Sequence, residues 1–271
     1  MDNRPIGVFD SGLGGLTAVR ELRRMLPSEN IIYFGDTSRV PYGSRSRETI
    51  LKYARQDIRF LRSFDLKAIV IACGTVSTTS LPALKAESDI PMLGVVEPAC
   101  RRALAVTKNK KVGLIATAAS VRSGAYEKIL HELDGDVQVI SRACPLFVPL
   151  VENGRFRPGD VVIETVAWEY LAPLGKTGID TLILGCTHYP LLTEVIGGVM
   201  GPEVTLINSG GESAWELKRT LRAAGALAAP EQTGEARFYA SDRVEDFEKL
   251  AGLFLQEDLK GSVSQINIEA Y

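Results

Sequence analysis

The sequence has few of the residues that mark disulfide-rich or zinc-dependent proteins. Four cysteines and two histidines occur in 271 residues, and no Cys-x-x-Cys pair is present. This composition argues against a disulfide framework and predicts free thiols in a reducing cytoplasm. Cys186 and His188 could supply two zinc ligands, but the sequence offers no obvious partners for them. We therefore expect neither a disulfide nor a metal.

Neither an excess of one charge nor a long apolar run is present. Lys and Arg number 31 against 33 Asp and Glu, which gives a net charge of −2, so a broad basic surface for nucleic acid is not expected. No apolar run approaches the roughly 20 residues that a membrane helix needs. The first residues, Met1–Pro5, are unlike a signal peptide. These features predict a cytoplasmic protein that binds neither nucleic acid nor membranes.

Short apolar runs alternate with helical patterns along most of the chain. The run Ile6–Phe9, for example, precedes apolar residues at helical spacing: Leu16, Val19, Leu22 and Met25. The same patterns predict helices over about residues 76–86 and 244–255 and strands over residues 181–184 and 263–268. Repeated strand–helix units predict doubly wound, parallel α/β sheets. Breaks at Glu97-Pro98 and Asn208–Gly211 suggest two pseudo-symmetric lobes. We expect residues 1–97 with 208–271 in the first lobe, residues 98–207 in the second, and the active site between them.

Two stretches share one design, Ile69–Thr75 (IVIACGT) and Leu182–His188 (LILGCTH). In each, an apolar run ends in a small residue, a cysteine and then a threonine. The carboxyl ends of parallel strands are where such sheets bind ligands, so Cys73 and Cys186 are predicted to face one pocket. At a strand-to-helix junction, free N–H groups and the helix dipole favour a thiolate. Two such thiols suggest an acid/base pair rather than a lone nucleophile.

The alternative for any single cysteine is a small buried hydrophobe, which we expect for Cys100 and Cys144. His188 follows Cys186 closely enough to tune that thiol or relay its proton, and the alternative is a polar residue at a helix start. Glu152 is a lone acid after an apolar run, which by itself indicates little.

Polar residues also follow the first two predicted strands. Asp10 and Ser11 come at the end of the first, where a carboxylate would suit a substrate ammonium group or would cap a helix. The Gly-rich turn there lacks the last glycine of G-x-G-x-x-G, because Thr17 occupies that position. A dinucleotide is therefore weakly supported. Pro41, Tyr42 and Gly43 could offer a hydroxyl and a backbone N–H to a carboxylate, or form a plain turn.

Four longer motifs, in this order, resemble glutamate racemases: FDSGLGGLT (Phe9–Thr17), YFGDTSRVPYG (Tyr33–Gly43), CPLFVPLVENG (Cys144–Gly154) and LILGCTHYPLL (Leu182–Leu192). The similarity extends from Ile6 to about Trp215. It implies a cofactor-independent enzyme of two α/β lobes, usually a homodimer. Such an enzyme interconverts L- and D-glutamate and supplies D-glutamate for bacterial peptidoglycan.

The resemblance also implies roles for individual residues. Cys73 and Cys186 match the two catalytic bases, the first acting on D-glutamate and the second on L-glutamate. Asp10, Glu152 and His188 match groups that assist proton transfer. The positions that match substrate-binding residues are Asp10, Ser11, Pro41, Tyr42, Gly43, Gly74, Thr75, Thr117, Ser120, Thr187 and His188.

Gly74 is the departure from the family pattern with the largest expected consequence. The family usually has Asn after the first catalytic cysteine, and we expect a side chain there to face the substrate, so that Gly74→Asn should improve a weakened enzyme. Ala99 and Ser120 are milder departures. The alternatives are a related aspartate racemase or arylmalonate-type decarboxylase with a pocket altered at Gly74, a non-catalytic amino-acid sensor or partner-binding protein, and a nucleotide-binding protein using Asp10–Gly15.

Overall fold

The computed structural model describes residues 1–255, 257, 259 and 261–271. The first lobe is built on strands from both ends of the chain. Its strands are β1 (Ile6–Asp10), β2 (Ile31–Gly35), β3 (Ala68–Ile71), β4 (Met92–Gly94), β9 (Ala236–Ala240) and β10 (Val263–Gln265). They form a parallel sheet in the order β10-β9-β2-β1-β3-β4. The strands β9 and β10, from the C-terminal segment, thus lie in the same sheet as β1–β4.

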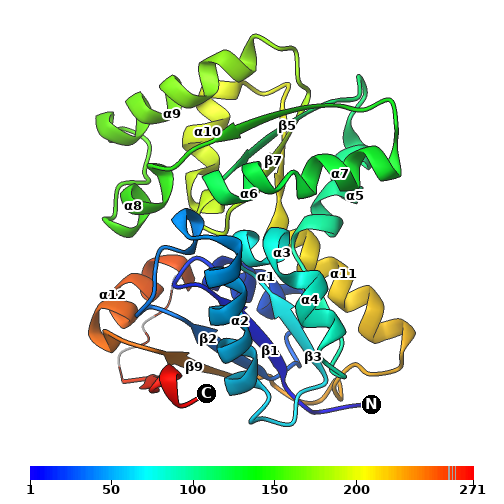
Figure 1. The fold of residues 1–271 in the computed structure, drawn as a ribbon, viewed down its shortest axis with the longest axis vertical. Coiled ribbons are helices and arrows are strands. Elements are labelled where there is room, and N and C mark those ends of the chain that lie inside the picture. Colours follow the sequence, from blue (N-terminus) through cyan, green and yellow to red (C-terminus); the bar gives the residue numbers. More distant parts are fainter. Residues whose placement is uncertain (256, 258, 260) are drawn as a thin grey trace.

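Helices cover both faces of this sheet (Figure 1). They are α1 (Leu16–Met25), α2 (Arg47–Leu61), α3 (Gly74–Thr79), α4 (Leu81–Ala86), α11 (Ser209–Ala223) and α12 (Val244–Leu255), with 3₁₀ turns η1 (Tyr42–Ser44) and η3 (Ile268–Ala270). The helix α1 packs against both α11 and α12. Strands β1, β2 and β3 are buried throughout, as expected for parallel strands covered on both faces.

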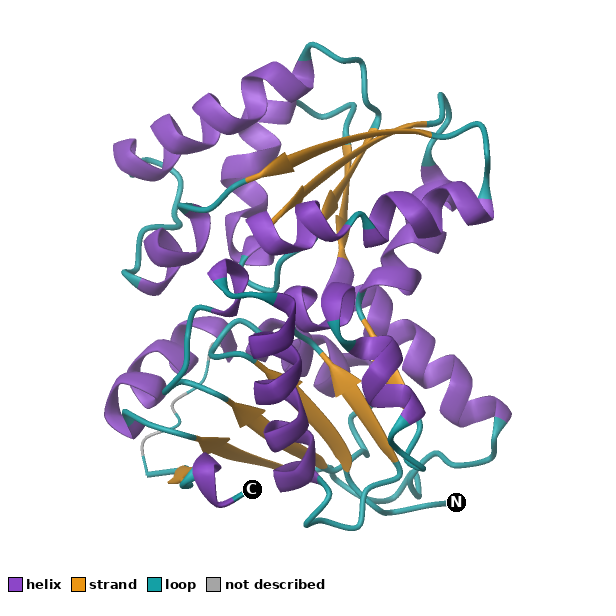
Figure 2. Ribbon diagram, in the orientation of Figure 1, coloured by secondary structure: helices purple, strands orange, loops and turns teal. Residues whose placement is uncertain are grey.

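The second lobe has a smaller sheet in the order β6-β5-β7-β8, also parallel (Figure 2). Its strands are β5 (Lys111–Ala116), β6 (Gln138–Ala143), β7 (Thr181–Leu184) and β8 (Thr205–Asn208). Its helices are α5 (Val96–Val106), α6 (Ala118–Ser123), α7 (Ala125–Leu133), α8 (Phe147–Glu152), α9 (Val161–Gly175), α10 (Thr193–Met200) and the 3₁₀ turn η2 (Tyr189–Leu192). The predicted architecture of two parallel α/β lobes is confirmed.

Strand register brings the sequence motifs to one edge of each sheet. Phe9 pairs with Ile71 in the first sheet, and Ile115 pairs with Leu184 in the second. The residues that follow each pair therefore leave their sheet together. The carboxyl-terminal edge of the first sheet carries Asp10 and Cys73, and that of the second sheet carries the residues after β5 and β7.

Both predicted breaks are starts of helices rather than linkers. Pro98 lies in the first turn of α5, where a missing N–H costs no helical hydrogen bond. Asn208 caps α11, its Oδ1 accepting hydrogen bonds from the N–H groups of Gly210 and Gly211 at 3.1 and 3.3 Å. The division at residues 97/98 and 207/208 stays a proposal.

Two other expectations were wrong in detail. The helix predicted around residues 76–86 is two helices, α3 and α4, that meet at Ser80. The strand predicted for residues 263–268 ends at Gln265, and Ile268 opens the 3₁₀ turn η3 instead. Asn267 caps that turn through its side chain, a local preference that competes with continued strand pairing.

Among the described residues, we find no helix with the length and apolar character that crossing a membrane requires.

Candidate active site

A cavity of about 490 Å³ contains both predicted thiols and receives residues from both lobes. The first lobe contributes the segments after β1, β2 and β3, and the second contributes those after β5, β6 and β7. The predicted site residues that line it are Ser11, Pro41, Tyr42, Gly43, Cys73, Gly74, Thr75, Thr117, Glu152, Cys186, Thr187 and His188. The sheets thus bring together residues that are far apart in the sequence.

Cys73 lies between β3 and α3 and is 4% exposed. Its Sγ donates a hydrogen bond to the Ser11 Oγ at 3.2 Å. Burial, with the Asp10 charge adding to it, raises the pKa of the Cys73 thiol to about 12. Hydrogen bonds from Ser11 and from the backbone of Val76 oppose this shift but do not reverse it. The expectation that the strand-to-helix junction makes Cys73 a thiolate is wrong, because desolvation outweighs the few donors there.

Cys186 follows β7 and has a histidine beside it. The Sγ of Cys186 lies 3.9 Å from the His188 Nδ1, and the His188 Nε2 lies 3.0 Å from the Glu152 Oε1. Burial opposes a charge on His188, but the contacts with Cys186 and Glu152 outweigh it and raise the pKa of His188 to about 10. At neutral pH the ring is an imidazolium held between a sulfur and a carboxylate. Such a cation stabilises a neighbouring thiolate.

Asp10 lies behind the cavity wall and does not line it. Its carboxylate is 1% exposed, accepts the Gly12 N–H at 3.0 Å and lies 3.5 Å from the Thr187 Oγ1. Burial raises the pKa of Asp10, while the His188 charge opposes this effect. The group therefore contacts the second lobe through Thr187 and reaches a ligand indirectly.

Hydroxyl groups join the two lobes beside the cavity. The Oγ1 atoms of Thr75 and Thr117 lie 3.1 Å apart, and the Thr17 Oγ1 donates to the Thr187 carbonyl at 2.8 Å. Ser120 is fully buried behind Thr117, with their side-chain oxygens 3.1 Å apart. Ser120 thus orients a cavity-lining hydroxyl and is not among the lining residues itself.

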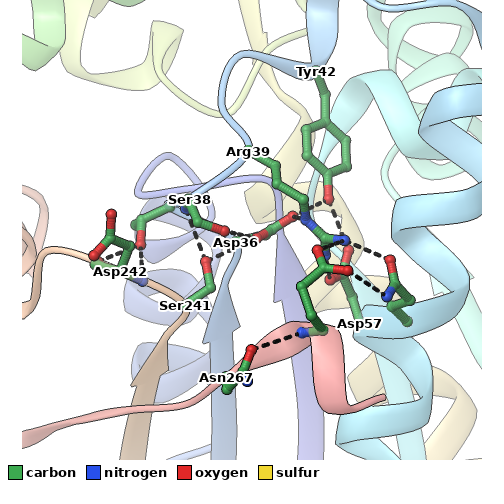
Figure 3. A network of polar contacts seen from close by, with 11 residues as sticks. Asp36, Ser38, Arg39, Tyr42, Asp57, Ser241, Asp242 and Asn267 are labelled. Atoms are coloured by element: carbon green, nitrogen blue, oxygen red, sulfur yellow. Dashed lines mark hydrogen bonds and ion pairs between the residues drawn. The ribbon is translucent and has the colours of Figure 1, made fainter.

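Tyr42 lines the cavity, but its hydroxyl lies elsewhere. The side chain is 1% exposed, and its Oη contacts the carboxyl groups of Asp36 and Asp57 inside the first lobe (Figure 3). The expectation that this hydroxyl is offered to a ligand is wrong, because α2 supplies its partner Asp57. The N–H groups of Tyr42 and Gly43 have no partner among the residues that the structure describes.

Gly74 lies directly against the second lobe. A Cβ on this residue would lie 2.5 Å from the Gly185 carbonyl oxygen, which is closer than two such atoms can approach. The backbone of one segment would have to shift to accommodate it. The expectation that a side chain here faces the substrate is therefore wrong for this arrangement, because the Cα–Cβ direction points at the other lobe. The glycine permits a backbone contact between the two cysteine-bearing segments.

Arg122 is the functional candidate that sequence reasoning missed. It comes from α6, one turn after Thr117 caps that helix, and it lines both the cavity and a neighbouring cleft of about 790 Å³. No ion pair with a described residue neutralises it. Its place on the short helix that Thr117 begins, directly after β5, is the signal that could have identified it. Cys144 was expected to be a buried hydrophobe; it is fully buried and also lies against the cavity.

Metal-binding chemistry has no support from side-chain placement. Within the described ranges, no group of three or more His, Cys, Asp or Glu side chains is arranged to hold an ion. The Cys186–His188–Glu152 row is a hydrogen-bonded relay in which Nδ1 and Nε2 are both engaged.

The chain is similar to known racemases over most of its length. Residues 11–217 match the family model described as Asp/Glu/Hydantoin racemase. The glutamate racemase of Geobacter metallireducens is 44% identical, with 98% of each chain covered.

Solved structures give the same result. A glutamate racemase isoform from Bacillus anthracis superposes with a TM-score of 0.93, 42% identity and 98% of each chain covered. The glutamate racemase of Francisella tularensis, solved in complex with D-glutamate, has a TM-score of 0.90, 38% identity and full coverage of both chains. On these grounds the chain belongs to the aspartate/glutamate racemase family of isomerases.

Proposed function

We propose that the chain is a glutamate racemase that interconverts L- and D-glutamate with two cysteines and no cofactor. The observation that carries this proposal is the pair of thiols, Cys73 and Cys186, which reach one cavity from two separate sheets. The names of its relatives supply the substrate. Racemisation requires a proton to leave one face of Cα and another to arrive at the opposite face, which two opposed thiols can do without turning the substrate over.

The surroundings of the two thiols suggest their resting states. Cys73 is a buried thiol with a pKa of about 12, whereas Cys186 lies beside the imidazolium of His188. In the L-to-D direction, the Cys186 thiolate takes the Cα proton, and the Cys73 thiol delivers its own proton to the other face. Afterwards Cys73 is the thiolate and Cys186 the thiol, which is the arrangement that the D-to-L direction needs.

Electrostatic stabilisation must replace the electron sink that a cofactor would provide. The hydroxyls of Ser11, Thr75, Thr117 and Thr187 are placed to bind carboxylate oxygens, and the N–H groups of Tyr42 and Gly43 can add to them. Arg122 supplies positive charge at the same cavity. In this scheme Asp10 acts through Thr187 and through the local field, rather than by holding the substrate ammonium group directly.

The biological setting follows from the same proposal. D-Glutamate made by the enzyme would enter peptidoglycan in a bacterial cytoplasm, and the enzyme would act as a homodimer. Light scattering of the purified protein across a concentration series tests the homodimer independently of catalysis.

The test of the function is an assay without added cofactor. Dialysed protein is incubated with L-glutamate, D-glutamate, L-aspartate and D-aspartate in parallel, and optical activity is followed. Loss of optical activity with both glutamate enantiomers, and little with aspartate, is the expected result. Activity with aspartate alone, or activity that depends on added pyridoxal phosphate, would contradict the proposal.

A further inference from the structure

The segment between β2 and α2 has two faces with different partners. Val40, Pro41 and Gly43 line the cavity, while Asp36, Arg39 and the Tyr42 ring turn into the first lobe (Figure 3). The exposed fractions of Asp36, Arg39 and Tyr42 are 0%, 9% and 1%. The contacts that these three buried side chains make inside the first lobe therefore hold the loop in place.

Arg39 is the centre of these contacts. Its Nε donates to the Asp36 Oδ2 at 2.6 Å and its Nη2 donates to the Asp57 Oδ1 at 2.8 Å. The Gln56 Oε1 accepts from Nη1 at 2.6 Å, and the guanidinium lies 4.3 Å from the centre of the Tyr53 ring. Three residues of α2 thus fix one arginine, and the exposed Glu269 is a weaker partner at 3.5 Å.

Asp36 has donors at both of its oxygens. Its Oδ1 accepts from the Ser241 hydroxyl at 2.8 Å, which ties the loop to the end of β9, and from the Ser38 hydroxyl at 3.3 Å. Its Oδ2 accepts from Arg39 and from the Tyr42 hydroxyl. A carboxyl group with a donor at every oxygen is satisfied as an anion.

Asp57 differs because its Oδ2 shares the Tyr42 hydroxyl proton with Asp36. The Tyr42 Oη lies within hydrogen-bond distance of Asp36 and also lies 2.9 Å from the Asp57 Oδ2. A single hydroxyl proton can serve one of these carboxyl groups. The Asp57 Oδ1 already accepts from Arg39, so the missing proton belongs on Oδ2. In agreement, burial raises the pKa of Asp57 well above its ordinary value and the Asp36 charge adds to this, while Arg39 opposes it.

We propose that Asp36, Arg39 and Asp57 are positioning residues that hold the substrate-binding loop through Tyr42, with Asp57 in its protonated form donating to the Tyr42 hydroxyl. The cluster is then one anion, one cation and one neutral acid, so it is electrically balanced inside the lobe. It fixes the backbone of Tyr42 and Gly43 at the cavity without contacting the ligand. The kinetic part of this inference rests on the proposed function, whereas the protonation part does not.

Infrared spectroscopy tests the protonation of Asp57 directly. Wild-type protein at neutral pH should show the C=O stretch of a buried, protonated carboxyl group, and D57N should lack that band. An identical spectrum in D57N would overturn the assignment of the proton. This readout stands even if the wild type shows no glutamate racemisation.

Kinetics of two variants at the same position test the positioning role. An amide reproduces both contacts of a protonated carboxyl group, so D57N should keep KM for glutamate within about threefold of wild type. D57A removes one partner from Arg39 and one from Tyr42, and its KM should rise about tenfold or more with a smaller change in kcat. Equal KM values for D57A and wild type, or a KM for D57N as high as that of D57A, would refute the inference.

A matched control separates positioning from general stability. Lys67 and Glu29 form another buried ion pair in the same lobe, with side chains 1% and 2% exposed, and neither lines the cavity. E29Q should lower Tm while leaving KM unchanged. A rise in KM for E29Q that matches D57A at similar loss of Tm would mean that Asp57 acts only through stability.

Discussion

Cys73 and Cys186 occupy equivalent places in the two lobes, each just beyond a buried parallel strand, yet their surroundings differ. Cys73 contacts a serine hydroxyl, and burial together with the Asp10 charge raises its pKa to about 12. Cys186 has the imidazolium of His188, held by Glu152. The same strand-end design thus places a buried thiol with a raised pKa on one wall and a thiol beside a histidine on the other. The comparison teaches that burial and neighbouring charged groups, rather than the place at a strand end, distinguish the surroundings of the two thiols.

Removal of either thiol is expected to have the largest effect. C73A and C186A should each lower kcat/KM for both enantiomers by about 10⁴-fold or more, since each direction needs both groups and a general acid or base contributes up to that factor. Circular dichroism of glutamate follows the reaction. C100A, which removes a buried thiol of α5 outside the cavity, is the control and should retain activity. A single-cysteine variant that racemises at a rate near wild type would break the comparison.

The imidazolium of His188 distinguishes the Cys186 wall of the cavity from the Cys73 wall. Substitution of His188 should therefore have the next largest effect. H188N should lower kcat about 10²-fold with a smaller change in KM, because the cation beside Cys186 assists proton transfer. The chain's other histidine, His131, is exposed at the end of α7, and H131N should behave as wild type. A change confined to KM would reassign His188 to substrate positioning.

Substitutions at Gly74 test how closely the Cys73 and Cys186 segments must approach each other. Because a Cβ would lie 2.5 Å from the Gly185 carbonyl oxygen, G74A and G74N should both lower kcat/KM, by about tenfold. This reverses the expectation drawn from the sequence. G74A carries the Cβ without the amide, so steady-state kinetics of the pair separate the two effects. An increase in kcat/KM for G74N alone would show that its amide reaches the substrate and that the lobes adjust.

Arg122 tests whether charge outside the thiol pair contributes to binding. R122A should raise KM about three- to tenfold with little change in kcat, as expected for a partly solvated cation facing a carboxylate. R101A removes an arginine of α5 that pairs with Glu97 and should leave KM unaltered. Equal KM values for R122A and R101A would remove Arg122 from the binding site.

The last expected effect concerns stability rather than activity, and it is a pH dependence that arises on the Cys186 wall. His188 has a pKa of about 10 in the folded protein against an ordinary 6.5, so folding binds its proton more tightly. Its contribution to the free energy of unfolding is full below pH 6.5 and is lost as the pH rises toward about 10. Urea titrations of wild type and H188N across this window should converge at the alkaline end. A constant difference between them would contradict the raised pKa.

Local sequence patterns were sufficient for much of the fold. The strand Thr181–Leu184 and the helix Val244–Leu255 have the bounds that their apolar spacing predicts. The two cysteine-bearing strands could also be placed at one cavity, because the carboxyl ends of parallel strands meet ligands at one edge.

Directions of side chains in the loops could not be predicted, because partners distant in the sequence set them. The Tyr42 hydroxyl turns inward to Asp57, and the Gly74 Cα–Cβ direction points at Gly185. The difference between the thiols was also hidden, since it depends on burial and on Glu152 reaching His188 across 36 positions. Pattern reasoning therefore brought the proposed reacting groups to one cavity but could not indicate how their surroundings differ.

The most direct test of two opposed thiols is the fate of the Cα hydrogen in D₂O. L-Glutamate is incubated with the enzyme in D₂O without cofactor, and both enantiomers are separated and analysed by mass spectrometry at low conversion. The account predicts that the D-glutamate formed carries one deuterium, delivered by Cys73, while unreacted L-glutamate carries none. Early deuterium in the L-glutamate pool, or protium retained in the product, would show that one group serves both faces and would contradict the account.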